Sequence, residues 1–315
     1  MARTPSQIRQ LKNLLDRADA LARVVTASWR RAVREIRKEV AYMTGELNVG
    51  RNAANRERVI RQVQYHINRL GRRIDRLENA HLEYTGKAAL KAVDGYTGVR
   101  VEYSKTRADA ILSLIRARNG GSMAATFTRA MSKTAVSALR NAVVAAFQEQ
   151  AVSGGTMAEL NRSIRDRWDA IVRDERNFRF VDRSGRVWET GRYIQMNVRA
   201  NSMQIYNHQL MDGYARANGS DLVRVSKDGR TEESCDACRK WAGRILSITG
   251  ATKGFPTVEH AEDDGLFHPN CIHTLETVVE GWDDDIEEQK AEYESGWEEE
   301  ADAELVGAKR RDRRA

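Results

Sequence analysis

Residues 8–36 have the sequence IRQLKNLLDRADALARVVTASWRRAVREI, in which apolar and small side chains recur at alternating steps of three and four residues. This spacing is the heptad pattern of a helix that packs along one seam, as in a coiled coil. The pattern predicts one long helix that ends near residues 48–50, where Asn and Gly favour termination. The seam consists of Ile8, Leu11, Leu15, Ala18, Ala22, Val25, Trp29, Ala32 and Ile36.

A second seam of the same kind follows after a short turn. Two seams joined by a Gly-containing turn predict an antiparallel helical hairpin over residues 1–85. His81 ends the second seam, and we expect it to be a packed polar residue rather than a ligand. The second seam consists of Ile60, Val63, Ile67, Leu70, Ile74, Leu77 and His81, and the other faces carry Arg51, Arg56, Arg58, Arg61, Arg69, Arg72, Arg73 and Arg76.

Helical patterns continue through residues 86–219, and glycines interrupt them. Gly86, Gly95 and Gly98 predict a looser connection directly after the hairpin. The Ala-rich composition of the stretch that follows Gly121 is suited to close packing between helices. The expected helices lie at about 104–118, at 122–152, from Thr156 onward and at about 193–217.

Shorter signals mark three further elements. Thr156 and Glu159 have the spacing of a capping box, which is typical of the first turn of a helix. Aromatic and apolar pairs flank Asp182-Arg183-Ser184-Gly185, and this pattern predicts a short β-hairpin near residues 178–188. Residues 221–226 alternate apolar and polar side chains, as a strand does.

Charge is distributed unevenly along the chain. The net charge is +7, but from Glu280 onward 14 acidic residues face 6 basic ones, so the first 279 residues carry +15. A basic body favours a polyanion such as DNA, or it is a solvated Arg-rich helix surface, and the sequence leaves both interpretations open. Blocks of like charge are typical of solvated tails, so we expect residues 281–315 to be disordered.

Composition excludes several classes of protein. Only 3 prolines occur in 315 residues, which favours a helix-rich protein. No window of about 18 apolar residues exists, so we expect no membrane span. The stretch Met1–Pro5 lacks the apolar run of a signal peptide, so we expect synthesis in a cytoplasm. No Gly-rich loop ending in Gly-Lys-Ser/Thr is present, which argues against an ATPase.

All three cysteines fall into one cluster with two histidines. The pattern is Cys-x2-Cys followed, thirty residues later, by His-x2-Cys-x-His. Each x2 knuckle can direct two soft ligands to one tetrahedral ion, and thiolate with imidazole is the mixture that zinc prefers. The candidate ligands of a structural zinc ion are Cys235, Cys238, His268, Cys271 and His273. We favour the three cysteines with one histidine, and the spacing does not choose between His268 and His273.

Other interpretations of the cluster are weaker. A zinc deaminase needs His-x-Glu followed by Pro-Cys-x-x-Cys, whereas His260 and Glu262 come after the first knuckle, and no Pro precedes Cys235. A cysteine nucleophile with a histidine base would make an enzyme, but only proximity supports it. A nucleic-acid-binding zinc module remains an alternative function, and packed thiols without metal remain an alternative structure.

Consecutive landmarks run through residues 221–276, and in them the chain resembles a family of phage proteins. The landmarks are Leu222-Val223-Arg224-Val225-Ser226, Cys235-x-x-Cys238, Trp241-Ala-Gly243-Arg244-Ile245, Leu246-Ser247-Ile248-Thr249-Gly250, Phe255-Pro256 and Gly265-Leu266-Phe267-His268-Pro269-Asn270-Cys271-Ile272-His273. They resemble the minor capsid proteins of tailed bacteriophages, the Mu F-like and minor capsid protein 2 group. Ile272 stands where the family usually has Arg, and His273 stands where some members have Cys.

The resemblance implies a structural virion protein rather than an enzyme. Such proteins are present in few copies, associate with the portal protein and the inner face of the major capsid protein, and aid head assembly or the packaging and ejection of DNA. It implies a place in the virion after assembly in the host cytoplasm. The long basic helical hairpin itself suits contact with packaged DNA or with another coiled protein. The oligomeric state stays open, because a seam can close within one chain or between chains.

Together these patterns predict a mainly α protein. A long antiparallel hairpin at 1–85 and a helical region at 86–219 precede a small α+β domain at 220–280, which holds the Cys/His knuckle. A closed metal site would suit a domain of this size, because its apolar core is small.

Overall fold

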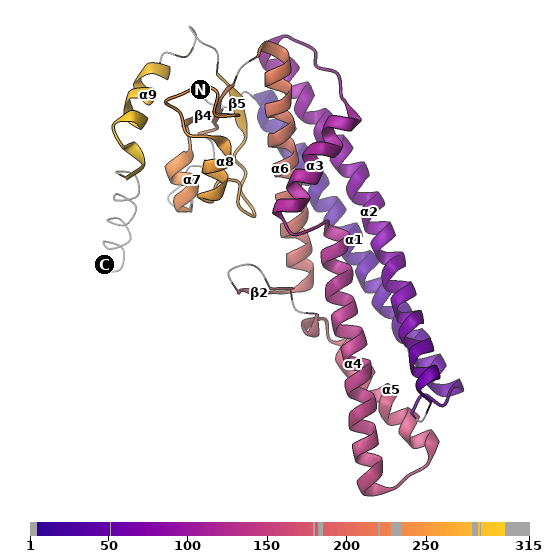
Figure 1. The fold of residues 1–315 in the computed structure, drawn as a ribbon. Helices are drawn as coiled ribbons and strands as arrows, with labels where there is room; N and C mark the ends of the chain where they lie inside the picture. Colours follow the sequence, from indigo (N-terminus) through magenta and orange to yellow (C-terminus); the bar gives the residue numbers. More distant parts are fainter. Residues whose placement is uncertain are drawn as a thin grey trace. The chain divides into compact units, whose positions relative to one another are not determined.

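The computed structural model describes residues 5–299 apart from 51, 179, 182–184, 220, 228–234, 279–282 and 284. Within these residues the fold is mainly helical, with a long helical hairpin, further helices and a small mixed part near the C-terminus (Figure 1). This confirms the predicted fold class. None of the helices in these residues combines the length and the apolar character that a membrane crossing requires.

The elements follow one another in a simple order. The helices are α1 (Pro5–Glu46), α2 (Ala53–Thr97), α3 (Lys105–Arg118), α4 (Met123–Ser153), α5 (Met157–Arg173), the short 3-10 helix η1 (Glu175–Asn177), α6 (Thr190–Asn218), α7 (Asp236–Trp241), α8 (Val258–Asp263) and α9 (Ile286–Glu294). The strands are β1 (Phe180–Val181), β2 (Val187–Trp188), β3 (Leu222–Val225), β4 (Ile245–Ser247) and β5 (Leu275–Thr277).

The chain packs into two compact units, each built from separate stretches of sequence. Unit 1 consists of Met1–Arg17, His81–Ile115 and Arg199–Ala315, and unit 2 consists of Ala18–Ala80 and Arg116–Val198. The long helices α1, α2 and α6 contribute residues to both units. The predicted boundaries at 85, 219 and 280 divide the chain into consecutive segments. Each compact unit instead combines stretches from separate parts of the chain.

Unit 2 is a helical bundle around a large apolar core. The seam residues of α1 and α2 meet the small-residue face of α4 and the apolar stripe of α5 in one cluster. Trp29 packs edge-on against Phe178 at a ring distance of 5.3 Å, and Phe180 stacks on Tyr193 at 4.5 Å. The indole of Trp168 is 1% exposed and donates to the carbonyl of Ala135 at 3.0 Å. Apolar packing therefore holds this unit together.

The α1 seam is confirmed over most of its length, but its first residues are shifted. Leu14 is 1% exposed, Leu15 is half-buried, and Ile8 is 55% exposed. An α-helix has 3.6 residues per turn rather than 3.5, so a strict heptad drifts off the buried face. The heptad pattern predicts a step of three residues from Ala18 back to Leu15. The structure instead has a step of four residues, from Ala18 back to the buried Leu14.

The looser connection predicted at Gly86 and Gly95 is wrong, because α2 continues through both to Thr97. Ala89 and Val93 are fully buried on the intervening turns and hold the helix in the core of unit 1. A Cβ at Gly86 would lie 3.1 Å from the ring of Tyr103, so this glycine permits a close approach. His81, as predicted, is a packed polar residue, with Nε2 2.7 Å from Ser202 Oγ.

Two small antiparallel sheets complete the fold. In unit 2, β1 pairs with β2 and aligns Phe180 with Trp188, which confirms the predicted hairpin, although its turn at 182–184 lies outside the described residues. In unit 1, the strand order is β4-β3-β5, and β3 is the strand predicted at 221–226. Every residue of β3 is buried, including Arg224, so the strand is covered on both faces.

The acidic stretch after residue 282 is partly built into unit 1. Buried Arg224 contacts Asp285 at 2.6 Å and Asp283 at 3.1 Å, and Arg244 pairs with Glu292. Trp297, beyond α9, is 7% exposed in the unit 1 core. Within the tail predicted for 281–315, residues 286–294 form the helix α9, and Asp285 and Glu292 have basic partners. Residues 300–315 lie outside the described residues.

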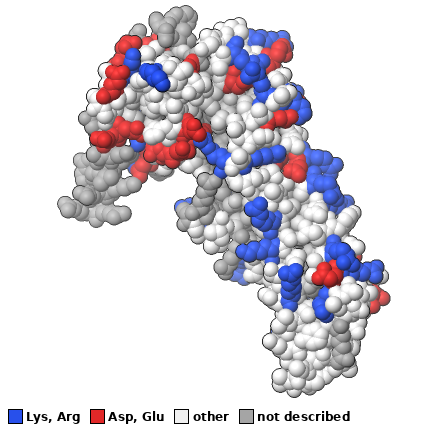
Figure 2. Space-filling model, viewed as in Figure 1, with Lys and Arg blue, Asp and Glu red and all other residues white. Residues whose placement is uncertain are grey.

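Charge separates between the two units. Unit 2 holds 28 Lys and Arg against 15 Asp and Glu, a net charge of +13, whereas unit 1 holds 24 against 30, a net charge of −6. On the face drawn in Figure 2, acidic side chains gather over α9. The predicted basic body is thus concentrated in the helical bundle, and the Cys/His cluster belongs to the acidic unit.

Candidate metal centre

The first knuckle of the cluster is formed by α7. Cys235 is the N-cap residue of this helix, and its Sγ accepts a hydrogen bond from the backbone N–H of Cys238 at 3.4 Å. Cys238 follows one helical turn later and is buried, whereas Cys235 is exposed. Residues three apart on a helix lie on the same face, so both thiols point to the same side.

The second knuckle is a tight turn between α8 and β5. The backbone N–H of Cys271 donates to the carbonyl of His268 at 2.9 Å, which closes the turn. Asn270 and Phe267 adopt positive φ angles of 69° and 58°. Asn tolerates this region well, and Phe267 is held there because its side chain is buried in the unit 1 core. The turn presents His268 and Cys271 to α7.

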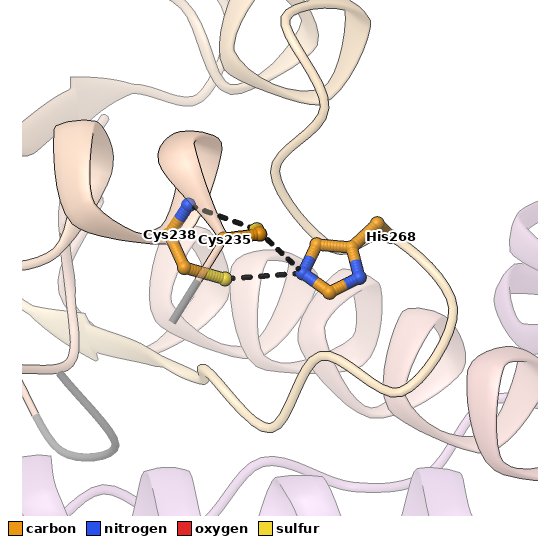
Figure 3. Close-up of side chains that lie close together, drawn as sticks. All are labelled: Cys235, Cys238 and His268. Atoms are coloured by element: carbon orange, nitrogen blue, oxygen red, sulfur yellow. Dashed lines mark hydrogen bonds between the residues drawn. The ribbon is translucent and has the colours of Figure 1, made fainter. Parts of the chain in front are cut away.

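Three donor atoms, those of Cys235 and Cys238 from the first knuckle and of His268 from the second, lie close together (Figure 3). Nε2 of His268 lies 3.0 Å from Cys235 Sγ and 3.2 Å from Cys238 Sγ. Cys238 Sγ lies 3.9 Å from Cys271 Sγ, which in turn lies 3.4 Å from Nδ1 of His273. The structure thus brings together all five residues that the sequence singles out, in two groups of three that share Cys238.

These separations suit a metal ion. In a tetrahedral zinc site, with Zn–S of about 2.3 Å and Zn–N of about 2.0–2.1 Å, neighbouring ligand atoms lie about 3.5–3.8 Å apart. Of the four distances in the cluster, 3.4 and 3.9 Å lie close to that range, and 3.0 and 3.2 Å are shorter than it. The cluster is therefore positioned to hold a metal ion.

The two histidines differ in how they are oriented. Nδ1 of His268 lies 2.7 Å from the carbonyl oxygen of Pro269, which can only accept, so Nδ1 carries the proton and Nε2 offers a lone pair to the thiols. A histidine fixed in this way by its second nitrogen is the usual form of a metal ligand. His273 is 2% exposed and directs Nδ1 only to Cys271, while its buried Nε2 has no hydrogen-bond partner among the described residues.

The two buried thiols differ in acidity. The hydrogen bond from Cys238 lowers the pKa of Cys271, and the interaction with His273 lowers it further. The same contact between the thiols raises the pKa of Cys238, and burial adds to that effect. Of these two thiols, Cys271 therefore more readily adopts the thiolate form that metal ligands need.

The sequence gives no sign of the polar contacts that frame the cluster. Asn207 on α6 donates to the carbonyl of His273 at 3.1 Å. Lys240, with a side chain only 3% exposed, pairs with Asp264 at 3.1 Å and Glu298 at 3.3 Å. These residues come from distant parts of the chain, and no local motif marks them.

The His-x-Glu pair of the deaminase interpretation does not join the cluster. Nε2 of His260 lies 2.7 Å from Glu298, and Glu262 lies 3.3 Å from His208. Each residue has a partner of its own on another element. The geometry gives the pair no part in a metal site.

The comparison with known families gives one match. The family model described as Phage minor capsid protein 2 matches residues 54–314, from the start of α2 to the C-terminus. The matched residues include the whole Cys/His cluster and extend far beyond the landmarks at 221–276. No curated protein and no solved structure matches the chain.

Proposed function

Because the chain belongs to the phage minor capsid protein 2 family, we propose that it is a minor structural component of the head of a tailed bacteriophage, located inside the capsid at the portal vertex. It contacts the portal protein and the major capsid protein there, and it aids head assembly or the packaging and ejection of DNA. It is assembled into the head in the host cytoplasm. The observation that carries the proposal is the family match over residues 54–314.

Within this role, the Cys/His cluster holds a structural zinc ion. Cys235, Cys238, Cys271 and His268 are the four ligands, because His268 directs Nε2 to two of the thiols. His273 supports Cys271 from outside the coordination sphere. The ion neutralises the thiolates and fixes α7 to the turn at 268–271, so the small sheet presents a constant surface to its partners.

The cluster is less suited to the two alternative functions. A nucleic-acid-binding zinc module needs a basic surface, whereas the unit that holds the cluster carries a net charge of −6. A Cys/His enzyme would need the 3.0 Å contact between Cys235 and His268 to act as a nucleophile and base. A second group of donors, Cys271 and His273 with Cys238, adjoins this pair, and it favours a structural metal site instead.

Quantitative mass spectrometry of purified virions tests the proposed role. The chain should be present at a few copies per major capsid assembly and should cross-link to the portal protein. A phage that lacks the chain should give defective heads or particles that eject DNA poorly. Absence from purified virions, with normal heads in the deletion phage, would refute the proposal.

Metal analysis of matched variants tests the ligand assignment. The purified chain should contain one zinc ion, and Cys235→Ser and His268→Gln should both reduce zinc occupancy. His273→Gln is the matched control and should keep zinc. Reduced occupancy in His273→Gln, with normal occupancy in His268→Gln, would reverse the assignment, and metal-free protein of native fold would leave the cluster as packed thiols.

A further inference from the structure

A groove between α1 and α2 of unit 2 is lined by basic side chains. Its volume is about 660 Å³, and its polar lining consists of Arg31, Arg34 and Glu35 on α1 and of His66, Arg69 and Arg73 on α2, with Ser28 beside them. One carboxylate thus faces four guanidinium groups. Both walls are regular helices anchored in the apolar core of unit 2, so the backbone positions of the arginines are fixed.

The arginines of this groove differ from their neighbours on α1. Arg30 is paired with Glu175 at 2.7 Å, and Arg37 is paired with Asp169 at 2.5 Å. By contrast, the four groove arginines form no ion pair with any residue that the structure describes. Acidic residues therefore compensate one face of α1, while the groove face keeps its charge.

From this geometry we infer that the groove, which we call the arginine groove, binds the phosphate backbone of double-stranded DNA. A duplex carries about one negative charge per 1.7 Å of its axis, so a single ligand can contact several of these arginines at once. Guanidinium groups bind phosphate oxygens through paired hydrogen bonds. The contacts are to the backbone, so binding is independent of base sequence.

The lining favours DNA over an acidic protein segment. Stable protein interfaces need large apolar or aromatic anchors that fill pockets. The groove offers only Val24 and Leu70 as larger apolar side chains, and Leu70 is already buried in the bundle. The inference rests on the proposed place in the phage head, where duplex DNA is the abundant polyanion.

Binding of a fluorescent 30-base-pair duplex to the full chain tests the inference, measured by anisotropy over a series of salt concentrations. The groove variant carries Arg31→Gln, Arg69→Gln and Arg73→Gln, and all three positions are exposed. The matched control carries Arg58→Gln, Arg61→Gln and Arg129→Gln, which are also exposed, lie outside the groove and remove the same charge. Circular dichroism verifies that both variants keep the helical fold.

The groove variant should bind DNA at least about tenfold more weakly at low salt. The slope of log K against log salt, which is negative, should become less steep by about 3. The control should change affinity by less than about threefold. An equal loss in both variants, or no binding by the parent chain, would overturn the inference. Competition by polyglutamate as strong as that by DNA would identify an acidic protein as the ligand instead. The virion analysis above is independent, so this inference can fail while the proposed function stands.

Discussion

Units 1 and 2 bury different kinds of side chain. Sixteen polar or charged residues are buried in the described part of the chain, and unit 1 contains twelve of them, including Arg224, Lys240 and Glu276. Unit 2 contains the other four, beside a core of tryptophan, phenylalanine, alanine and branched aliphatic side chains. Both units have an apolar core, and unit 1 depends in addition on specific polar pairs and on its Cys/His cluster.

The difference predicts different responses to solution conditions. Apolar burial changes little between pH 4 and pH 8 and does not need a metal ion. The stability that buried ion pairs and histidines contribute depends on pH. The stability that thiolate ligands contribute depends on pH and on the bound metal ion. Perturbing the metal or the pH should thus unfold unit 1 before unit 2, and the two can be followed separately by hydrogen exchange.

Loss of the metal centre should give the largest effect. Cys238→Ser removes a buried sulfur that lies near both His268 and Cys271. Structural zinc contributes about 10–16 kcal/mol of binding free energy in small zinc peptides, so its loss should open most of the small sheet and α7. Hydrogen exchange should show lost protection in β3, β4 and β5, with unchanged protection in α4 and α5.

A chelator provides the control for this experiment. Treatment of the parent chain with a strong chelator should reproduce the exchange pattern of Cys238→Ser, and added zinc should reverse it. Equal loss of protection in α4 and α5 would show that the two units unfold together, and it would contradict their separate stabilisation.

The reverse perturbation is a cavity in unit 2. Trp168→Ala removes a side chain that is 1% exposed and the hydrogen bond from its indole to the carbonyl of Ala135. Substitutions of this kind cost about 3–5 kcal/mol. Denaturant unfolding and hydrogen exchange should show a weakened α4–α5 pair, while zinc content stays at the parent value. Zinc loss in this variant would contradict the separate stabilisation of the units.

Local patterns in the sequence predicted what depends on neighbouring residues. The spacing of apolar residues identified both seams, and two short knuckles identified all five cluster residues, because helix faces and metal ligands follow fixed local spacings. Periodicity does not show what covers a face. Leu14 replaced Leu15 on the buried face because the helical repeat drifts from a heptad.

Contacts between residues far apart in the chain could not be predicted from the sequence, because no local pattern marks both partners. An alternating strand places Arg224 on a face that would ordinarily be solvated, and only the later Asp283 and Asp285 make its burial favourable. The acidic stretch predicted a solvated tail because its partners lie about 60 residues earlier in the chain. In the same way, α2 continues from Gly86 to Thr97 because Ala89 and Val93 pack in the core of unit 1, which no local signal reveals.

Protonation of His81 should give a moderate effect that is confined to unit 1. Burial lowers the pKa of His81 from 6.5 to about 4, and the charge of Arg17 contributes. The folded protein therefore stays unprotonated while the unfolded chain binds a proton between pH 6.5 and pH 4, so the free energy of unfolding falls as the pH is lowered through that window. The full loss is about 3 kcal/mol.

His81→Gln isolates this contribution. Glutamine can still contact Ser202 but does not titrate, so the variant should lose less stability than the parent between pH 6.5 and pH 4. Subtracting the variant's free energy of unfolding from that of the parent at each pH cancels the contributions of the other groups that titrate in this range. Identical pH profiles would show that His81 is protonated without cost in the folded protein.

The smallest effect is expected at Asp221, which organises the loop after β4. Its carboxylate accepts hydrogen bonds from the hydroxyls of Ser247 and Thr249, at 2.5 and 2.6 Å, and from the backbone N–H groups of Thr249 and Thr252. Burial raises the pKa of Asp221, but these hydrogen bonds outweigh it and lower the pKa from 3.8 to about 2. The stabilisation is complete above pH 3.8 and is lost as the pH falls through about 2.

Asp221→Asn keeps the shape of the side chain and removes its charge. Because the carboxylate is only partly buried, we expect a loss of about 1 kcal/mol at pH 7, measured by denaturant unfolding of unit 1. The difference between variant and parent should shrink as the pH falls from about 4 to 2, since protonation removes the same charge from the parent. A difference that stays constant over this range would mean that shape rather than charge holds the loop.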